Sequence, residues 1–205
     1  MTEPILLDFP DSITTERLIL RSPRPGDGKA VFQAVKESQE HLKNWMPWAV
    51  DIPDEEGYEK WARENYLEFI GRVNLSMLMI LKESGKIIGG SGYHTLNWEI
   101  PSCEIGYWIH PAYSGRGYMT EAVSTLTDFA FENFEAARVE IRCDAANQRS
   151  AAVAKRAGYA LEATFHNHRR HHLTNELTTT LVYAKTANRS EQIKRGNLKW
   201  KNRQR

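Results

Sequence analysis

The stretch that most constrains the fold is residues 105–122, where an apolar, β-rich run leads through a short loop into a helical pattern. Gly115 and Gly117 stand in the loop, and a residue without Cβ tolerates positive φ and a close backbone approach. The helix that follows leaves its first N–H groups without an intrahelical partner and carries a partial positive charge at that end. Strand, loop and helix start together predict a binding site for a phosphate or pyrophosphate.

Strand and helix patterns alternate on both sides of this stretch. Residues 1–15 are expected to be an irregular lead-in, and Asp27 is the expected N-cap of a first helix that Pro47 ends. With no repeat or linker, the chain is predicted to form one α/β domain over residues 1–187, followed by a basic tail, residues 188–205. Strands are predicted over residues 17–22, 74–82, 86–94, 102–110, 138–144, 159–171 and 176–184, and later helices over residues 54–70, 117–132 and 148–157.

Composition excludes several classes of protein. Lysine and arginine number 27 and aspartate and glutamate 26, so net charge does not indicate DNA or a membrane as the main partner. The tail has seven Lys or Arg against one Glu and could make a weak RNA contact, although such runs are usually solvated termini. The two cysteines, Cys103 and Cys143, indicate a reducing compartment without a disulfide framework. No signal peptide or membrane span is recognisable, so a cytoplasmic location is expected.

A dinucleotide-binding fold is a poor explanation of the glycine loop. Thr120 stands where the third glycine of that fingerprint belongs. Glu140 lies early in its predicted strand, whereas the acid that binds a ribose lies at the end of one. The loop is therefore expected to bind a phosphate group of another kind.

Three ordered motifs carry a specific resemblance. They are Thr-Glu-Arg-Leu-Ile-Leu-Arg over residues 15–21, Glu-Ile-Gly-Tyr-Trp-Ile-His-Pro over residues 104–111 with the glycine loop and Glu121, and residues 147–150 with 156–159. Over residues 14–185 the chain resembles the GNAT N-acetyltransferase superfamily, closest to the branch that acetylates the N-termini of ribosomal proteins. The resemblance implies a mixed, mostly antiparallel twisted sheet with a splayed central parallel strand pair and flanking helices. It also implies acetyl-CoA as co-substrate and no metal.

The same resemblance assigns the donor site. The pantetheine arm is expected to bond to main-chain groups near Trp108, Ile109 and His110, in the wedge between the splayed strands, and Asn147 is expected near the thioester. Ser114 and Met119 depart from the family pattern, but backbone N–H groups hold the phosphates, so neither change removes the site. The pyrophosphate is expected at Gly115, Arg116, Gly117, Tyr118, Met119 and Thr120.

Two residues are candidates for catalysis. Glu104 interrupts an apolar strand, where burial would raise its pKa toward a range useful for a general base. The alternative is a carboxylate on the solvated face of that strand. Ser150 could protonate or steer the departing thiolate, the alternatives being a helix-cap role and a water as proton donor. The tyrosine acid of many family members is missing, because Ala154 stands at about its position.

Substrate selection is expected in residues 45–48 and the closing hairpin, with Trp45, Trp48 and His168 as binding residues, although aromatic side chains are more often core. The histidines at positions 166, 168, 171 and 172 resemble a metal tract. The strand pattern puts 171 on the face opposite the other three, and no acidic or cysteine partner lies nearby, so no metal is expected.

The acceptor amine is left open by the sequence. An α-amine with a pKa of about 8 is about 10% neutral at pH 7, whereas a lysine amine is roughly 0.04% neutral. A weaker general base is therefore sufficient for an N-terminal amine than for a lysine. The first hypothesis is therefore transfer to the N-terminal amine of a protein, for instance a ribosomal protein. The alternatives are a small amine (a polyamine, aminoglycoside or amino acid) and, last, a non-catalytic acyl-CoA-binding module. A monomer and a homodimer both remain possible.

Overall fold

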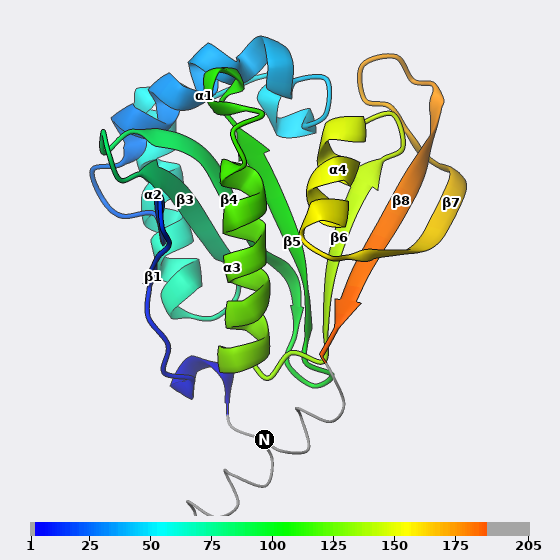
Figure 1. Cartoon of the computed structure of the whole chain (residues 1–205). Coiled ribbons are helices and arrows are strands. Elements are labelled where there is room, and N and C mark those ends of the chain that lie inside the picture. The colour runs from blue at the N-terminus through cyan, green and yellow to red at the C-terminus, as the bar shows by residue number, and fades with distance from the viewer. Residues whose placement is uncertain (1–2, 188–205) are drawn as a thin grey trace, which may run out of the picture.

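The computed structural model describes residues 3–187, so the predicted basic tail and its RNA contact lie outside the described residues. Its eight strands form one sheet in the order β1-β2-β3-β4-β5-β6-β8-β7, with α1 and α2 behind the sheet and α3 and α4 in front of it in Figure 1. The strands are β1 (Ser12–Thr14), β2 (Leu18–Arg21), β3 (Leu75–Leu81), β4 (Ile87–Asn97), β5 (Ser102–Ile109), β6 (Arg138–Asp144), β7 (Ala160–Arg170) and β8 (Leu177–Thr186). The helices are α1 (Gly28–Leu42), α2 (Glu55–Ile70), α3 (Tyr118–Asn133) and α4 (Gln148–Arg156), with short 3-10 helices η1 (Pro4–Leu6), η2 (Pro47–Ala49) and η3 (Pro111–Tyr113).

The central strands β5 and β6 are parallel and separate part of the way along. Every other neighbouring pair in the sheet is antiparallel. The register of β5 and β6 runs from Ser102 opposite Arg138 to Glu104 opposite Glu140 and ends there, although both strands continue. A wedge therefore opens beyond Glu104, which confirms the predicted mixed, mostly antiparallel sheet with a splayed central pair.

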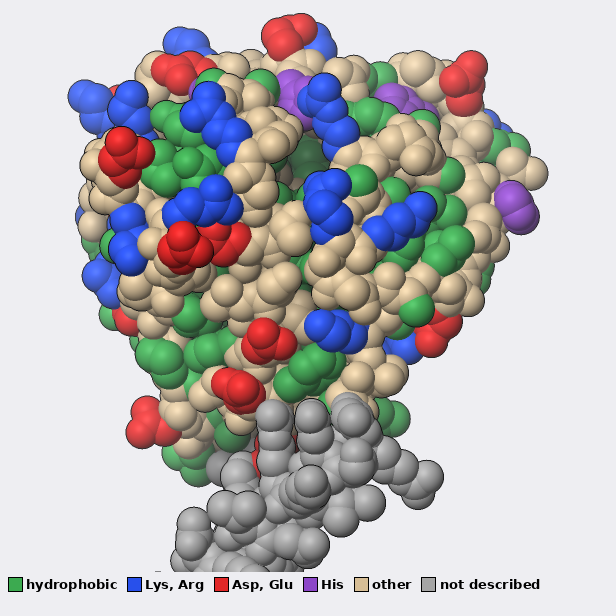
Figure 2. Space-filling view, viewed as in Figure 1, with side chains coloured by type: hydrophobic (Ala, Val, Ile, Leu, Met, Phe, Trp, Pro, Cys, Tyr) green, Lys and Arg blue, Asp and Glu red, His purple; other side chains and the backbone are tan. Residues whose placement is uncertain are grey.

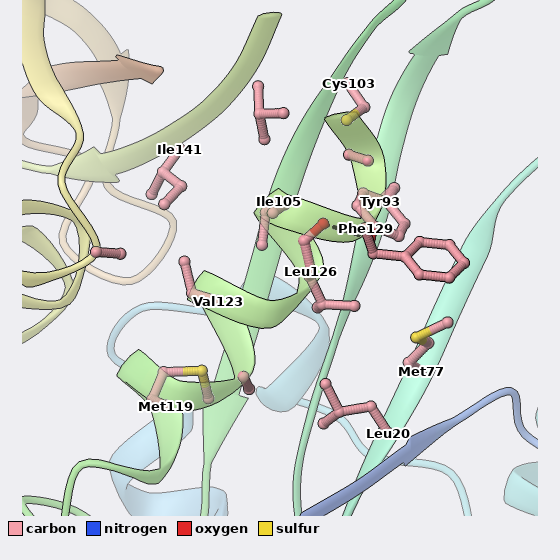
Figure 3. Packing of buried hydrophobic residues seen from close by; sticks show 14 of the residues in the cluster. Leu20, Met77, Tyr93, Cys103, Ile105, Met119, Val123, Leu126, Phe129 and Ile141 are labelled. Atoms are coloured by element: carbon pink, nitrogen blue, oxygen red, sulfur yellow. Dashed lines mark hydrogen bonds between the residues drawn. The ribbon is translucent and has the colours of Figure 1, made fainter. Parts of the chain in front are cut away.

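Helix α3 is held against the front of the sheet by the main core. Its buried side chains include Met119, Val123, Leu126 and Phe129, which Figure 3 shows beside Tyr93 and Ile105 of the strands. Tyr93 also donates a hydrogen bond of 2.6 Å from its hydroxyl to the carbonyl of Leu126. Burying a side chain such as Leu126 contributes roughly 1.5–3 kcal/mol. This packing fixes the N-terminal end of α3 beside the end of β5.

The predicted irregular lead-in is wrong at residues 12–14, which form the edge strand β1. Its register against β2 places Ser12 opposite Arg21 and Thr14 opposite Ile19. Three residues are too few to show the alternation by which a strand is recognised. Hydrogen bonding to a neighbouring strand, rather than side-chain pattern, therefore defines this element.

The first helix is also shorter than predicted. It ends at Leu42, and Pro47 opens the separate turn η2. Asp27 occupies the N-cap position, but its carboxylate accepts hydrogen bonds of 2.7 Å from Nη1 and Nη2 of Arg21 and not from the helix. A bidentate, charge-assisted pair is stronger than a single cap bond, so the arginine takes this carboxylate. None of the described helices has the length and apolar character of a membrane span.

Candidate active site

The loop between η3 and α3 presents unpaired amides. Gly115 and Gly117 have φ of 77° and 83°, and the first helical bond of α3 runs from Glu121 N to Gly117 O at 3.0 Å. The N–H groups of residues 115–120 donate to no other described residue. A Cβ on Gly115 would meet nothing within 4 Å, so positive φ and not crowding calls for glycine there. Consecutive free amides at a helix N-terminus fit a pyrophosphate.

A clamp from the β1–β2 turn holds this loop. Glu121, in the first turn of α3, accepts hydrogen bonds from Thr15 Oγ1 at 2.6 Å, Arg17 N at 2.9 Å and Arg17 Nε at 2.7 Å. Arg17 Nη1 donates to the carbonyl of Arg116 at 2.9 Å, and the guanidinium lies 4.4 Å from the ring centre of Tyr118. Burial alone would raise the pKa of Glu121, but these hydrogen bonds outweigh it and lower that pKa. The carboxylate stays charged and ties the loop to the sheet.

The start of α4 faces β5 across the wedge. Asn147 is the N-cap, because its side chain accepts from Ser150 N at 3.1 Å. Ser150 is therefore not the cap; its Oγ donates to the hydroxyl of Tyr107 at 3.0 Å, and that hydroxyl donates to Ser150 O at 3.0 Å. Burial raises the pKa of Tyr107, so its hydroxyl keeps its proton at neutral pH. Figure 2 shows this face hollowed between α3 and α4, with Lys and Arg side chains around the hollow.

A cavity of about 800 Å³ lies between the sheet and the α1–α2 side of the molecule. Its aromatic lining includes Trp45, Trp48, Tyr58, Trp61 and Trp108. Two glycines on the sheet make room for side chains that lie across it. A Cβ on Gly90 would come within 2.6 Å of Trp108 Nε1, and one on Gly106 within 2.8 Å of His94 Cδ2. The glycines therefore keep the floor of the cavity open.

Glu104 lies where the wedge begins, and its side chain lines the cavity with 28% of its surface exposed. Arg142 Nε lies 3.5 Å from Glu104 Oε2, while Arg142 Nη2 donates to Glu140 Oε2 at 2.9 Å. Burial raises the pKa of Glu104, Arg142 opposes that shift, and the neighbouring Glu140 adds to it. The net shift is upward, as a general base requires.

The hairpin between β7 and β8 is joined to the loop after α1. His171 Nε2 lies 3.0 Å from Asn44 O, and His172 Nε2 lies 2.7 Å from Lys43 O, with the two rings stacked. His171, His172 and Asn44 all line the cavity, so this contact closes one of its walls.

The predicted alternation of the histidines along one strand is wrong. A bulge between Phe165 and Arg169 breaks the register, and β7 ends at Arg170. His168 Nδ1 lies 3.0 Å from Thr180 Oγ1, and His168 is outside the cavity lining. Among the described residues there is no group of three or more His, Cys, Asp or Glu that could hold a metal.

The structure divides the residues singled out in the sequence between two sides of the wedge. Residues 115–120 form the loop and the first residues of α3, with Met119 buried in the core. The N–H of His110 already donates to Ile88 O at 2.8 Å, and its ring pairs with Glu37 at 3.0 Å. Ile109 is partly buried against the core. The cavity lining contains Glu104, Trp108, Asn147, Ser150, Trp45 and Trp48.

Several cavity residues carried no sequence signal. Tyr107 stands inside the strand motif, but only its contact with Ser150 shows that its hydroxyl faces α4. Arg142 and His94 lie on strands whose pairing with β5 is a tertiary feature. Asn65 and Glu68, on α2, line the far part of the cavity. A helical pattern predicts which face is buried but not that it borders a site.

Comparison with known proteins adds family evidence to this geometry. The family model described as "Acetyltransferase (GNAT) domain" matches residues 17–160. The ribosomal-protein-serine acetyltransferase of Escherichia coli (strain K12) is 27% identical over 148 residues, which cover 72% of this chain and 82% of that protein.

Two solved structures share the fold. The microcin C7 self-immunity acetyltransferase MccE, in complex with acetyl-CoA and AMP, has a TM-score of 0.79 at 19% identity, covering 87% of this chain and 98% of that one. The ribosomal L7/L12 α-N-protein acetyltransferase RimL, in complex with coenzyme A, has a TM-score of 0.78 at 22% identity, covering 85% and 97%.

Proposed function

Because this chain belongs to the GNAT acetyltransferase family and is an N-acetyltransferase that uses acetyl-CoA, we propose that its acceptor is the N-terminal α-amine of a protein, with ribosomal proteins as the leading class. The observation that carries the proposal is the end of the β5–β6 register at Glu104, with the amide-rich loop on one side of the sheet and the aromatic cavity on the other. Donor and acceptor can then approach from opposite faces and meet at the wedge.

The donor side has the groups that coenzyme A needs. The free amides of residues 115–120 would hold the pyrophosphate. Beyond Glu104 the edge of β5 has no register partner on β6, so its main chain can pair with the amides of the pantetheine arm. When bound, acetyl-CoA supplies the activated thioester.

The chain's own residues then move two protons. Glu104, with its raised pKa and its place in the cavity lining, would take a proton from the acceptor amine, directly or through a water. The hydroxyl of Ser150, held by Tyr107, would give or direct a proton to the departing thiolate. The remaining rate enhancement would come from holding the acceptor amine close to the thioester carbonyl in a reactive orientation.

Two arguments favour a chain end as acceptor. The wall formed by His171 and His172 against the loop after α1 encloses the cavity, which suits a slender segment better than a folded surface. An α-amine is also about 10% neutral at pH 7, so a single partly buried carboxylate is a sufficient base. The similarity to the ribosomal-protein-serine acetyltransferase of Escherichia coli supports this acceptor class.

The test is release of free thiol from acetyl-CoA with a panel of peptides whose lysines are blocked, each with a free and a blocked α-amine. We expect turnover only on the free termini and a large loss in the Glu104→Gln variant. Turnover on small amines, with none on any peptide, would replace the proposed acceptor by a small molecule.

A further inference from the structure

Polar side chains gather at the end of the cavity between α2 and β3. Asn65 and Glu68 come from α2, Asn74 immediately precedes β3 and Ser76 is the second residue of that strand, and all four line the cavity. The Nδ2 group of Asn74 faces three acceptors: Asn65 Oδ1 at 3.3 Å, Glu68 Oε2 at 3.1 Å and Ser76 Oγ at 3.2 Å. Asn65 is 8% exposed and the other three residues are half-buried, so the cluster lies in the wall of the cavity with Asn65 at its base.

Hydrogen-bond acceptors outnumber donors in this cluster. Four hydrogens are available as donors: two on the amide of Asn74, one on the hydroxyl of Ser76 and one on the amide of Asn65, whose other hydrogen is bonded to Trp61 O at 3.0 Å. They face five acceptor oxygens, two on Glu68 and one each on Asn65, Asn74 and Ser76, each with more than one lone pair. Asn74 Oδ1 is buried and accepts no hydrogen bond from the described residues. That oxygen is shielded from a ligand as well, whereas the carboxylate of Glu68 and the hydroxyl of Ser76 line the cavity and can accept a hydrogen bond from a donor that a ligand brings.

The charge at this end of the cavity also favours a hydrogen-bond donor that is positively charged. Glu68 forms no ion pair with another described residue, and the arginines of the lining (Arg142, Arg169 and Arg170) come from β6 and β7. The nearby Arg72 is directed away, with its Nη2 on Leu7 O at 2.9 Å and its Nη1 on Phe69 O at 2.9 Å. Tyr58 and Trp61 add aromatic lining that can cover an apolar stem.

We propose that Glu68 and Ser76, positioned by the Nδ2 group of Asn74, form a subsite of hydrogen-bond acceptors. It binds a hydrogen-bond donor, an ammonium or a hydroxyl, that the acetyl-accepting substrate carries in addition to its reacting amine. The inference rests on the proposed acetyl transfer and names the acceptor chemistry of the same cavity. A site built to accept hydrogen bonds rejects an analogue without the donor, because its polar groups are then left unpaired. Amine substrates that place an alkyl group at this subsite are therefore disfavoured.

Matched acceptors test the subsite. A series of straight-chain diamines, amino alcohols and alkylamines of equal length covers the unknown span from Glu104, and peptides that begin with Ser or Ala represent a protein terminus. We expect kcat/KM for the best diamine or amino alcohol to exceed that of its alkylamine by at least about tenfold, the value of one charge-assisted hydrogen bond. A preference confined to the Ser peptides would identify a protein as the source of the donor, and one confined to the small amines a metabolite.

Variants distinguish an ammonium from a hydroxyl as the group that the subsite binds. Glu68→Gln keeps the shape and removes the charge, so it should abolish the preference for an ammonium and leave that for a hydroxyl, whereas Ser76→Ala should weaken the preference for the hydroxyl. Glu64→Gln, on the exposed side of the same helix, is the matched control and should behave as wild type. Equal kcat/KM for acceptors with and without the hydrogen-bond donor would overturn the subsite. So would an ammonium preference that is unchanged in Glu68→Gln, or a hydroxyl preference that is unchanged in Ser76→Ala.

A binding measurement keeps this test apart from the proposed function. Calorimetry with the wild-type protein and coenzyme A compares the dissociation constants of each diamine and each amino alcohol with that of the alkylamine of equal length, without turnover. Tighter binding of the diamine or the amino alcohol supports the subsite even if no acetyl transfer is seen. Equal binding of all three compounds contradicts it even if peptides are acetylated.

Discussion

Arg17 and Glu121, which are 104 positions apart in the sequence, form an ion pair with Nε 2.7 Å from Oε2. The pair joins the β1–β2 turn to the first turn of α3, and the same arginine holds the carbonyl of Arg116. The opening sequence motif and the glycine-loop motif are thus two halves of one structural unit. The glycine loop is therefore held in its conformation by a residue far from it in the chain.

Arg17→Ala should weaken donor binding. The substitution removes the bonds to Glu121 and Arg116, so the loop amides lose their fixed orientation, and the KM for acetyl-CoA should rise by about three- to tenfold with a smaller change in kcat. The measurement is steady-state kinetics at varied acetyl-CoA. Arg24→Ala, which removes a more exposed pair with Asp11, is the control. A KM for acetyl-CoA equal to that of wild type would show that the clamp does not shape the donor site.

Tyr107→Phe should lower kcat by roughly tenfold, because Ser150 loses the hydroxyl that holds its side chain. Ser150 N keeps its bond to Asn147, so α4 should still fold. A double-mutant cycle that combines Tyr107→Phe with Ser150→Ala gives the coupling energy between the two side chains. The effects of the two substitutions on kcat should be far from additive. Strict additivity would mean that the two hydroxyls act independently.

The pH profile should report Glu104. A general base works when deprotonated, so kcat/KM should fall as pH drops through its raised pKa. Arg142→Gln removes a charge that lowers this pKa, so the acid limb should move to higher pH, and Arg169→Gln should move it in the same direction by less. Glu104→Gln should remove this step and leave only the fall that follows protonation of the acceptor amine. An acid limb that is unmoved in Arg142→Gln would assign it to another group.

Gly90→Ala should obstruct the acceptor cavity. The added Cβ would lie 2.6 Å from Trp108 Nε1, so the indole has to move off the sheet. We expect the KM for the acceptor to rise several-fold while the KM for acetyl-CoA stays near that of wild type, because the donor loop is on the other face. Gly85→Ala, in an open turn with φ of 69°, serves as the control for a general loss of stability. If both KM values change together, the substitution has disturbed the sheet and not only the indole.

The fold and the shape of the glycine loop were largely predictable because their motifs are local. Residues 105–122 contain strand, loop and helix start in one continuous run, so Gly115 and Gly117 could be assigned from sequence. Glu104 could be selected as the one carboxylate in an apolar strand, and the structure places it where the wedge opens. These features depend on neighbours in the chain.

The rest depends on contacts between distant residues. Helix α1 ends at Leu42, although no proline or glycine marks that point, and the proline expected to end it opens a separate turn. Tyr107 faces Ser150, 43 positions further on, and an apolar strand pattern cannot show that its hydroxyl is used. The acceptor-rich cluster of Glu68 and Asn74 exists only because α2 packs on β3.

The contact of His171 and His172 with the loop after α1 restricts the stage at which a protein substrate could be acetylated. It joins a hairpin near one end of the described chain to a loop near the other, so the cavity wall is held by bonds between two separate segments. A protein acceptor would have to present its first residues as an extended strand that is not yet packed elsewhere. For such a substrate, acetylation belongs before the terminus is buried by folding or by assembly into a larger particle.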